Sequence, residues 1–540
     1  MASADSTHPA PGGNYGLRRS LPSPSEWLAL ILGLVLVVRY RWLIDDAFVY
    51  FRYVDNLLFL GRGLVYNLGE YVEGFSSPLW TIVLIPLRAT QVGYWELVLG
   101  LGILSWTLFW AIGVAVNRAL CPPGARPFSL PLLFLSANYA VTTWFTSGLE
   151  QPFIQLAAAA FAWLVVRPNA RLPRVLVAFA PLVRPELVLP FVVGFFWVWG
   201  RTRRIPWLFG SLAVAIQLAW MAFRITYYAD LFPNTFHLKD GVYWEQGLAY
   251  LADAFLPYGV PYVAALLLGV GLCLDLAQRA NGPLFWAERG VMLLAALPGI
   301  LYVTKIGGTH LHYMYLAFPF CLVLFALSGI AEHVVGRLRS VAAVPLAVLI
   351  AAAAGLGYPS QQPQHPFWLE SSGTKVEHVI ADANLARHHR DLSYKKRRAE
   401  VPLAELLELE ERYEGGPVPH EEIAVHSWCA SMYRAVLYST INRHGLTDGI
   451  LARIQCEPTR PGHYPLRPFA LDIQAVQQAA SVIGQGMYRE AVEAGRAPEW
   501  IVAHLDRLEW LEAKIYNHHD FLENLSLALR FEPKIDPEEL

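Results

Sequence analysis

The sequence is poor in charged residues. Asp, Glu, Lys and Arg make up 16% of the 540 residues, whereas soluble globular proteins carry about 25%. Hydrophobic residues make up 55%, and the mean hydropathy is +0.35. This lack of charge excludes an ordinary soluble globular protein and predicts a membrane protein. The formal net charge is −2, so the composition of the whole chain gives no sign of nucleic acid as a partner.

Cysteines are also scarce, and we expect no cleavable leader. The five cysteines have no metal-ligand spacing. Cys429 and Cys456 lie in the polar C-terminal part, where they can pair if that part faces an oxidising compartment. Residues 1–24 are rich in Ser, Pro, Gly and Ala and predict a flexible cytoplasmic tail. The first apolar run lacks a small-residue cleavage site after it, so we expect a retained transmembrane helix.

Long apolar runs divide most of the remaining chain. A helix needs about 20 mostly apolar residues to cross a bilayer. Such runs predict about eleven transmembrane helices, over 25–44, 94–117, 128–146, 151–167, 172–183, 185–200, 206–223, 257–278, 288–303, 313–331 and 340–357. The run 78–91 is shorter and contains Arg88, so we expect it to lie at the membrane interface.

Arginines between these runs predict the orientation. With the N-terminus in the cytoplasm, every inner loop is basic, as the positive-inside rule requires. The inner loops then hold Arg18, Arg19, Arg118, Arg126, Arg167, Arg171, Arg174, Arg201, Arg203, Arg204, Arg279, Arg289, Arg337 and Arg339. We therefore expect an α-helical polytopic membrane protein with the N-terminus inside and the C-terminus outside. Its membrane domain would cover 25–357, with a first outer loop at 45–93, and 358–540 would form a soluble extracytoplasmic domain.

An acidic pair follows the first apolar run. Asp45 and Asp46 precede residues 47–61, whose apolar side chains recur at helical spacing, with Arg52 on the polar face. We expect a surface helix that holds both carboxylates just outside the lipid, although acidic residues at a helix exit are often only solvated ends. A shielded carboxylate can act as a general base, and two adjacent ones suit a divalent cation such as Mg, Mn or Ca. Arg52 is a candidate for substrate binding.

Three further charges are candidates for substrate binding. Glu73 lies in a loop marked by Gly and Pro, where it is either a ligand or an ordinary loop charge. Glu150 ends a tight turn between two spans, and it either serves function or faces the dipole of the next helix. Arg184 interrupts an apolar stretch beside Glu186, so a substrate contact and an internal ion pair are both open.

Basic residues occupy the later outer loops. His237, Lys239, Lys305 and His310 can bind a phosphate through charge-assisted hydrogen bonds. Together with the acidic loops they suit a sugar phosphate, because the leaving phosphate needs cations and the incoming hydroxyl needs a carboxylate. The polar groups gather on one face and no internal repeat is visible. This favours an enzyme over a transporter or flippase of lipid-linked saccharides. A non-catalytic binding module is a further alternative, which predicts no turnover with any donor and tolerance of changes at Asp45 and Asp46.

Several blocks occur in an order seen in a known family. They are Asp45–Phe48 with Phe51–Tyr53, Gly63–Asn67, Val72–Phe75 with Pro78–Trp80, Ser147–Glu150, Arg184–Glu186, Pro233–Lys239, and Gly445–Asp448 with Arg460–His463. Together they resemble the GT-C glycosyltransferases, above all the branch with the mycobacterial terminal β-arabinofuranosyltransferases of cell-wall arabinan. Thr309 stands where related sequences often have an Asp, so the resemblance implies no acidic or metal-binding role at that position.

The resemblance also implies an activity and a location. The donor would be a polyprenyl-phosphate-linked sugar, such as a pentofuranose, and the acceptor a glycan, lipid or protein of the cell envelope. Transfer would be inverting, with Asp45 or Asp46 as the catalytic base. The protein would be a multi-pass glycosyltransferase of the bacterial inner membrane, with its active site facing the periplasm.

Overall fold

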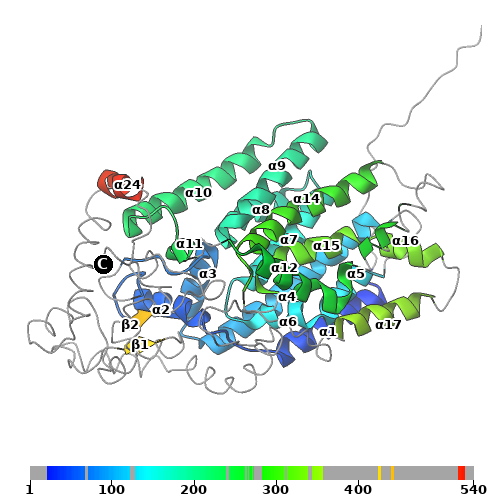
Figure 1. Ribbon diagram of the computed structural model, residues 1–540, viewed down its shortest axis with the longest axis horizontal. Helices are drawn as coiled ribbons and strands as arrows, with labels where there is room; N and C mark the ends of the chain where they lie inside the picture. The colour runs from blue at the N-terminus through cyan, green and yellow to red at the C-terminus, as the bar shows by residue number, and fades with distance from the viewer. Residues whose placement is uncertain are drawn as a thin grey trace, which may run out of the picture.

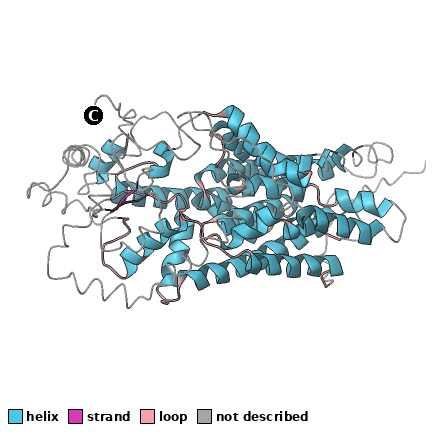
Figure 2. Cartoon of the chain, turned by 60° about the horizontal axis from the view of Figure 1, so that its bottom comes forward, coloured by secondary structure: helices cyan, strands magenta, loops and turns pink. Residues whose placement is uncertain are grey.

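The computed structural model describes thirteen stretches of the chain, and helices dominate them (Figures 1 and 2). These stretches are 21–66, 71–121, 128–238, 242–261, 264–265, 267–269, 272, 283–309, 313–337, 343–356, 424–426, 440–442 and 521–529. The longer helices are α1 (Pro24–Arg39), α4 (Tyr94–Leu120), α7 (Gln151–Val166), α8 (Arg171–Val183), α9 (Val188–Thr202), α10 (Trp207–Tyr228), α12 (Trp244–Phe255), α14 (Pro283–Lys305), α15 (Ala317–Ala326) and α17 (Ala343–Leu356).

Four helical segments of the described chain are long and apolar enough to cross a membrane. They are Tyr94–Leu120, Trp207–Tyr228, Pro283–Lys305 and Met314–Glu332. At 1.5 Å per residue, the 27 residues of α4 extend over about 40 Å, more than the hydrocarbon core of a bilayer. This agrees with the prediction of a helical membrane protein.

Shorter helices lie where most of the other spans are predicted, and several expose apolar side chains. On α1 these include Trp27, Ile31 and Val35, and on α9 they include Leu189 and Phe196. A helix can leave such side chains uncovered when lipid surrounds it, since its backbone groups are satisfied internally. These surfaces therefore fit a membrane environment around helices other than the four longest.

The predicted span 128–146 is not one continuous helix. It consists of α5 (Leu130–Ala137), α6 (Tyr139–Thr142) and the 3₁₀ turn η1 (Thr143–Thr146). Asn138 interrupts it with an extended backbone, and its side chain accepts a hydrogen bond from the Val141 amide at 3.3 Å. Asn favours this capping role because its short side chain competes with the helix for backbone donors. The chain therefore bends before it reaches the turn that contains Glu150.

Both short elements of the first loop are helical, as predicted. Helix α2 (Ala47–Leu58) and helix α3 (Pro78–Arg88) lie at one end of the bundle, the left in Figure 1. The polar face of α2 is buried rather than solvated. Arg88 Nε donates to Asp55 Oδ1 at 2.9 Å, and both side chains are almost fully covered. An internal ion pair thus fixes α3 against α2.

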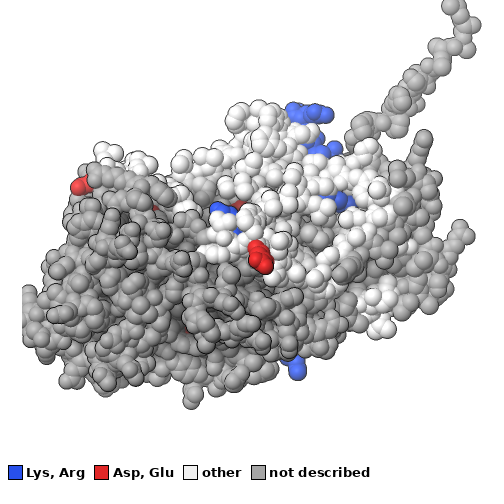
Figure 3. Space-filling view, viewed as in Figure 1, with Lys and Arg blue, Asp and Glu red and all other residues white. Residues whose placement is uncertain are grey.

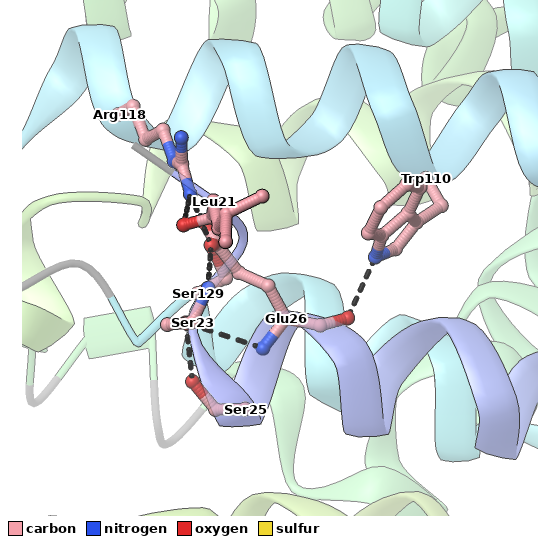
Figure 4. A network of polar contacts seen from close by, with 7 residues as sticks. All are labelled: Leu21, Ser23, Ser25, Glu26, Trp110, Arg118 and Ser129. Atoms are coloured by element: carbon pink, nitrogen blue, oxygen red, sulfur yellow. Dashed lines mark hydrogen bonds and ion pairs between the residues drawn. The ribbon is translucent and has the colours of Figure 1, made fainter. Parts of the chain in front are cut away.

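A polar network joins the start of α1, the end of α4 and the start of α5. The buried Glu26 carboxylate accepts hydrogen bonds from Arg118 Nη2 at 2.7 Å and from the Ser129 hydroxyl at 3.2 Å (Figure 4). Glu26 and Ser23 also form a capping box, which satisfies two donors at the start of α1. The indole of Trp110 donates to the Glu26 carbonyl at 2.7 Å.

The C-terminal part of the chain is described only in short pieces. Strands β1 (Ala424–His426) and β2 (Thr440–Asn442) pair in parallel, and helix α24 (Phe521–Leu529) contacts α10 through a 3.3 Å hydrogen bond from Asn524 to the Thr226 carbonyl. Cys429, Cys456 and the blocks 445–448 and 460–463 lie outside the described residues. The soluble domain at 358–540 and the tail at 1–24 therefore stay predictions.

Candidate functional site

The acidic pair lies at the start of α2, beside the turn that ends in Glu150. Asp45 and Asp46 form a turn and are partly exposed. The Ile44 amide just before them donates to the Ser147 carbonyl at 2.9 Å. Asp46 takes the N-cap position of α2 but makes no capping hydrogen bond with its side chain. The backbone thus attaches the acidic pair to the 147–150 turn, one hundred residues away in the sequence.

A glycine makes this close approach between α2 and the turn possible. Gly148 has a φ of +84°, and a Cβ added to it would lie 2.6 Å from the Ala47 Cβ. A larger residue would be strained in this backbone conformation and would push α2 away. Trp80 of α3 donates from its indole to the Gly148 carbonyl at 3.0 Å. The turn is therefore held between α2 and α3.

Glu150 lies at the centre of a buried polar cluster. Its Oε1 accepts from Arg184 Nη1 at 3.0 Å, and its Oε2 accepts from the Tyr50 hydroxyl at 3.1 Å. Arg184 also donates through Nε to Glu186 at 2.8 Å and through Nη1 to the Ser76 hydroxyl at 3.4 Å. We call Tyr50, Ser76, Glu150, Arg184 and Glu186 the Glu150 cluster. It joins four segments that are far apart in the sequence.

The Glu150 cluster shows how these charges are paired. Arg184 and Glu186 do form the internal ion pair, and Glu150 pairs with Arg184 instead of only facing the helix dipole. Glu150 is 1% exposed and Arg184 is 7% exposed. Arg184 donates from Nε to Glu186 and from Nη1 to Glu150, so two carboxylates hold this cation in a fixed orientation.

Tyr50 is a member of the cluster that the sequence reasoning missed. It lies on α2 four residues after Asp46, so the two share one face of the helix. Burial, and next the neighbouring Glu150 carboxylate, raise the pKa of the Tyr50 phenol well above its ordinary value. The phenol therefore stays protonated and donates to Glu150. The helical spacing from the acidic pair is the signal that could have found it.

Glu73 belongs to a second buried ion pair. Its carboxylate accepts from Nε of Arg224 on α10, and Arg224 Nη2 contacts Glu73 Oε1 at 3.2 Å. Burial raises the pKa of the Glu73 carboxyl, while Arg224 opposes the shift. Arg224 also escaped the sequence reasoning, although an arginine at the end of an apolar run is a signal in itself.

The Glu73–Arg224 pair also holds the loop that leads to His237. Arg224 Nη1 donates to the Leu231 carbonyl at 2.9 Å, and the Asn234 amide donates to the Glu73 carbonyl at 2.9 Å. Asn234 begins the short helix α11 (Asn234–Leu238), which contains His237. The first and a later outer loop predicted from the sequence therefore meet here.

Tyr315, which lies just after the last predicted outer loop, contacts both the Glu150 cluster and Tyr250. The Arg184 guanidinium lies 5.6 Å from the centre of the Tyr315 ring, and the Tyr315 amide donates to the Tyr250 hydroxyl at 3.4 Å. Gly308, with a φ of +73°, packs directly against the Tyr250 ring, which leaves no room for a side chain. Lys305 ends α14 a few residues earlier, with an exposed side chain.

The remaining predicted residues are distributed as follows. Arg52 is fully buried and donates from Nε to the Tyr66 carbonyl at 2.8 Å, so it supports the first loop. Lys239 and His310 lie outside the described residues.

Within the described part of the chain, no three His, Cys, Asp or Glu side chains come together to hold a metal ion. A divalent cation at Asp45 and Asp46 stays a prediction.

Two curated proteins are similar to this chain, and both are named terminal beta-(1->2)-arabinofuranosyltransferase. The one from Mycobacterium tuberculosis is 31% identical over 271 residues, which are 44% of this chain and 42% of that protein. The one from Corynebacterium glutamicum is 29% identical over 345 residues, 55% of this chain and 49% of that protein. The resemblance seen in the sequence blocks is thereby confirmed.

The chain spans about half the length of the curated relatives it matches. No family model matches the chain. No solved structure matches it either.

Proposed function

We propose that this chain is a membrane glycosyltransferase that transfers arabinofuranose, or a similar pentofuranose, from a polyprenyl-phosphate donor. The similarity to two arabinofuranosyltransferases carries the proposal, because it gives both the reaction class and the sugar. The site geometry supports it, since the Glu150 cluster brings an oriented cation to the end of the bundle where Asp45 and Asp46 lie.

The reaction needs a base and a site for the leaving group. In our proposal Asp45 or Asp46 takes the proton of an acceptor hydroxyl as its oxygen attacks the anomeric carbon. The bond from that carbon to the phosphate oxygen breaks, the electron pair leaves with the lipid phosphate, and the configuration inverts. Both residues are partly exposed, which suits contact with an acceptor.

Arg184 is our candidate for stabilising the departing phosphate. Phosphate groups are bound well by guanidinium groups whose orientation is fixed in advance. Glu150 and Glu186 fix Arg184 in this way, and Tyr315 covers one side of it. Lys305, His237, Lys239 and His310 would add positive charge from the later loops, and Glu73 would position the loop before α11.

The location of the site follows the predicted topology. About eleven spans, with the N-terminus inside, would put the site on the periplasmic face of the bacterial inner membrane. The acceptor would then be a glycan, lipid or protein of the cell envelope. If a divalent cation takes part, Asp45 and Asp46 are the side chains that would bind it.

Mass spectrometry of the purified protein tests the donor. We expect lipid extracts of the full-length protein to contain a polyprenyl phosphate that carries a pentose. Incubation with synthetic polyprenyl-phosphoryl arabinofuranose and an arabinan acceptor should then release the polyprenyl phosphate and extend the acceptor by one pentose. Binding of the donor without any extension of the acceptor would contradict the glycosyltransferase and favour a transporter.

A further inference from the structure

A group of arginines lies at the end of the helix bundle away from Asp45. Helices α7 and α8 are joined by residues 167–170, and α9 and α10 are joined by 203–206. Because α8 and α9 join at their other ends through 184–187, both turns lie at the same end of the bundle. These turns and the adjoining helix ends hold Arg167, Arg171, Arg174, Arg201, Arg203 and Arg204. No acidic residue occurs in 167–174 or 201–206.

The two turns are close together in space. The Trp197 indole on α9 donates to the Val165 carbonyl of α7 at 2.9 Å. The Arg201 guanidinium lies 5.7 Å from the centre of the Trp197 ring. Arg201 therefore contacts a tryptophan that is bonded to the last turn of α7, just before the α7–α8 turn. Figure 3 shows Lys and Arg side chains gathered where α9 and α10 meet, near the top of the view.

Three of these arginines are exposed and unused by the described part of the protein. Arg171, Arg203 and Arg204 are exposed, and their guanidinium groups make no hydrogen bond or ion pair with the described residues. Their neighbours differ, since Arg174 donates to the Pro168 carbonyl and Arg201 interacts with Glu288 of α14. The three exposed cations thus add positive charge that no described acidic side chain neutralises.

Large apolar side chains surround the same arginines. Trp207 is 72% exposed, Leu208 is 81% exposed and Leu172 is 55% exposed. Leu172 directly follows Arg171 in the sequence, and Trp207 comes three residues after Arg204. A strip of exposed tryptophan and leucine beside exposed arginine matches the boundary between lipid tails and headgroups. A soluble anion would contact only the arginines, whereas a phospholipid can contact the arginines with its headgroup and the apolar side chains with its acyl chains.

We propose that Arg171, Arg203 and Arg204, with Trp207 and Leu208, form a binding site for an anionic phospholipid. The guanidinium groups bind the headgroup phosphate, and Trp207 and Leu208 contact the acyl chains. This site is at the opposite end of the bundle from the Glu150 cluster and is independent of the proposed glycosyl transfer. In this proposal the phospholipid binds at a defined site and is not only part of the surrounding bilayer.

Native mass spectrometry with defined lipids tests the proposal. The full-length protein is titrated with phosphatidylglycerol or phosphatidylcholine of matched acyl chains. We expect phosphatidylglycerol to bind more tightly, and each of Arg171→Gln, Arg203→Gln and Arg204→Gln to weaken it about fivefold, the effect of one basic side chain near an anionic membrane surface. The triple variant should bind both lipids equally.

A matched control removes one arginine elsewhere. Arg39 is exposed at the C-terminal end of α1. Arg39→Gln should leave the preference for phosphatidylglycerol unchanged. Equal binding of both lipids by the wild-type protein would overturn the proposal. So would a preference that survives in the triple variant, or one that Arg39→Gln reduces as much as Arg203→Gln does.

Discussion

Removing the two partners of the buried Arg184–Glu150 pair should have unequal effects on stability. Arg184→Met leaves Glu150, 1% exposed, with the Tyr50 hydroxyl as its one side-chain hydrogen-bond partner among the described residues. Glu150→Gln leaves Arg184 with Glu186 at 2.8 Å. Removing one partner of a buried ion pair costs about 3–5 kcal/mol when the other charge is left uncompensated. We therefore expect about this loss for Arg184→Met and less than half of it for Glu150→Gln.

The double variant gives the sharper test. Arg184→Met with Glu150→Gln has no uncompensated charge at position 150, so it should be more stable than Arg184→Met alone. Thermal unfolding of the detergent-solubilised protein, followed by fluorescence, gives the order of the three variants. Ser211→Ala is a suitable control, because Ser211 is exposed outside the cluster and its 3.4 Å contact with the Leu208 carbonyl is a marginal hydrogen bond. Strictly additive losses, or a larger loss for Glu150→Gln than for Arg184→Met, would refute our account of the pair.

Three further predictions concern Tyr50, Glu26 and Glu73. Tyr50→Phe removes the hydrogen bond to Glu150. We expect sugar transfer to be slower by about tenfold or more, since a hydrogen bond to a charged group contributes about 1.5–3 kcal/mol. A wild-type rate of transfer would contradict this. Glu26→Gln should lower the melting temperature without changing the KM for donor, because the Glu26 network joins helix ends away from the candidate site; a change in KM would contradict this. Burial raises the pKa of Glu73 above its ordinary 4.5, so the folded state binds a proton more tightly than the unfolded state. The stability that Glu73 contributes should therefore be full below about pH 4.5 and fall as the pH rises, and melting curves of Glu73→Gln should lack this component; a parallel pH profile of variant and wild type would count against it.

The transmembrane helices could be predicted because a helix that crosses a bilayer needs a long run of apolar residues. The predicted positions of α2, α3 and α4 agree with the structure because their apolar residues recur at helical spacing or continue for a full span. The break at Asn138 was not predicted, because a capping side chain inside an apolar run leaves almost no trace in hydropathy. The count of spans and the orientation depend on loops and termini, so they stay predictions.

The candidate site was predictable only in part. Charges in apolar surroundings pointed to Glu150 and Arg184, since such charges are costly unless they have a partner. Glu73 was a candidate only as a charge in a loop marked by Gly and Pro. Their partners were harder to find. The helical spacing of Tyr50 from Asp46 places it near the acidic pair, but only the fold shows that it contacts Glu150. Pairings between residues one hundred positions apart leave no pattern in a single sequence.

The acidic pair remains the centre of the account, and a transfer assay tests it most directly. Asp45→Asn, Asp46→Asn and the double variant are purified with the wild-type protein and given polyprenyl-phosphoryl arabinofuranose and an arabinan acceptor. Melting curves check that each variant is folded, and release of polyprenyl phosphate is measured. We predict that one single variant and the double variant lose transfer by about 100-fold or more, as expected for a general base, while still binding the donor. Full transfer by all three folded variants would contradict the assignment of the base.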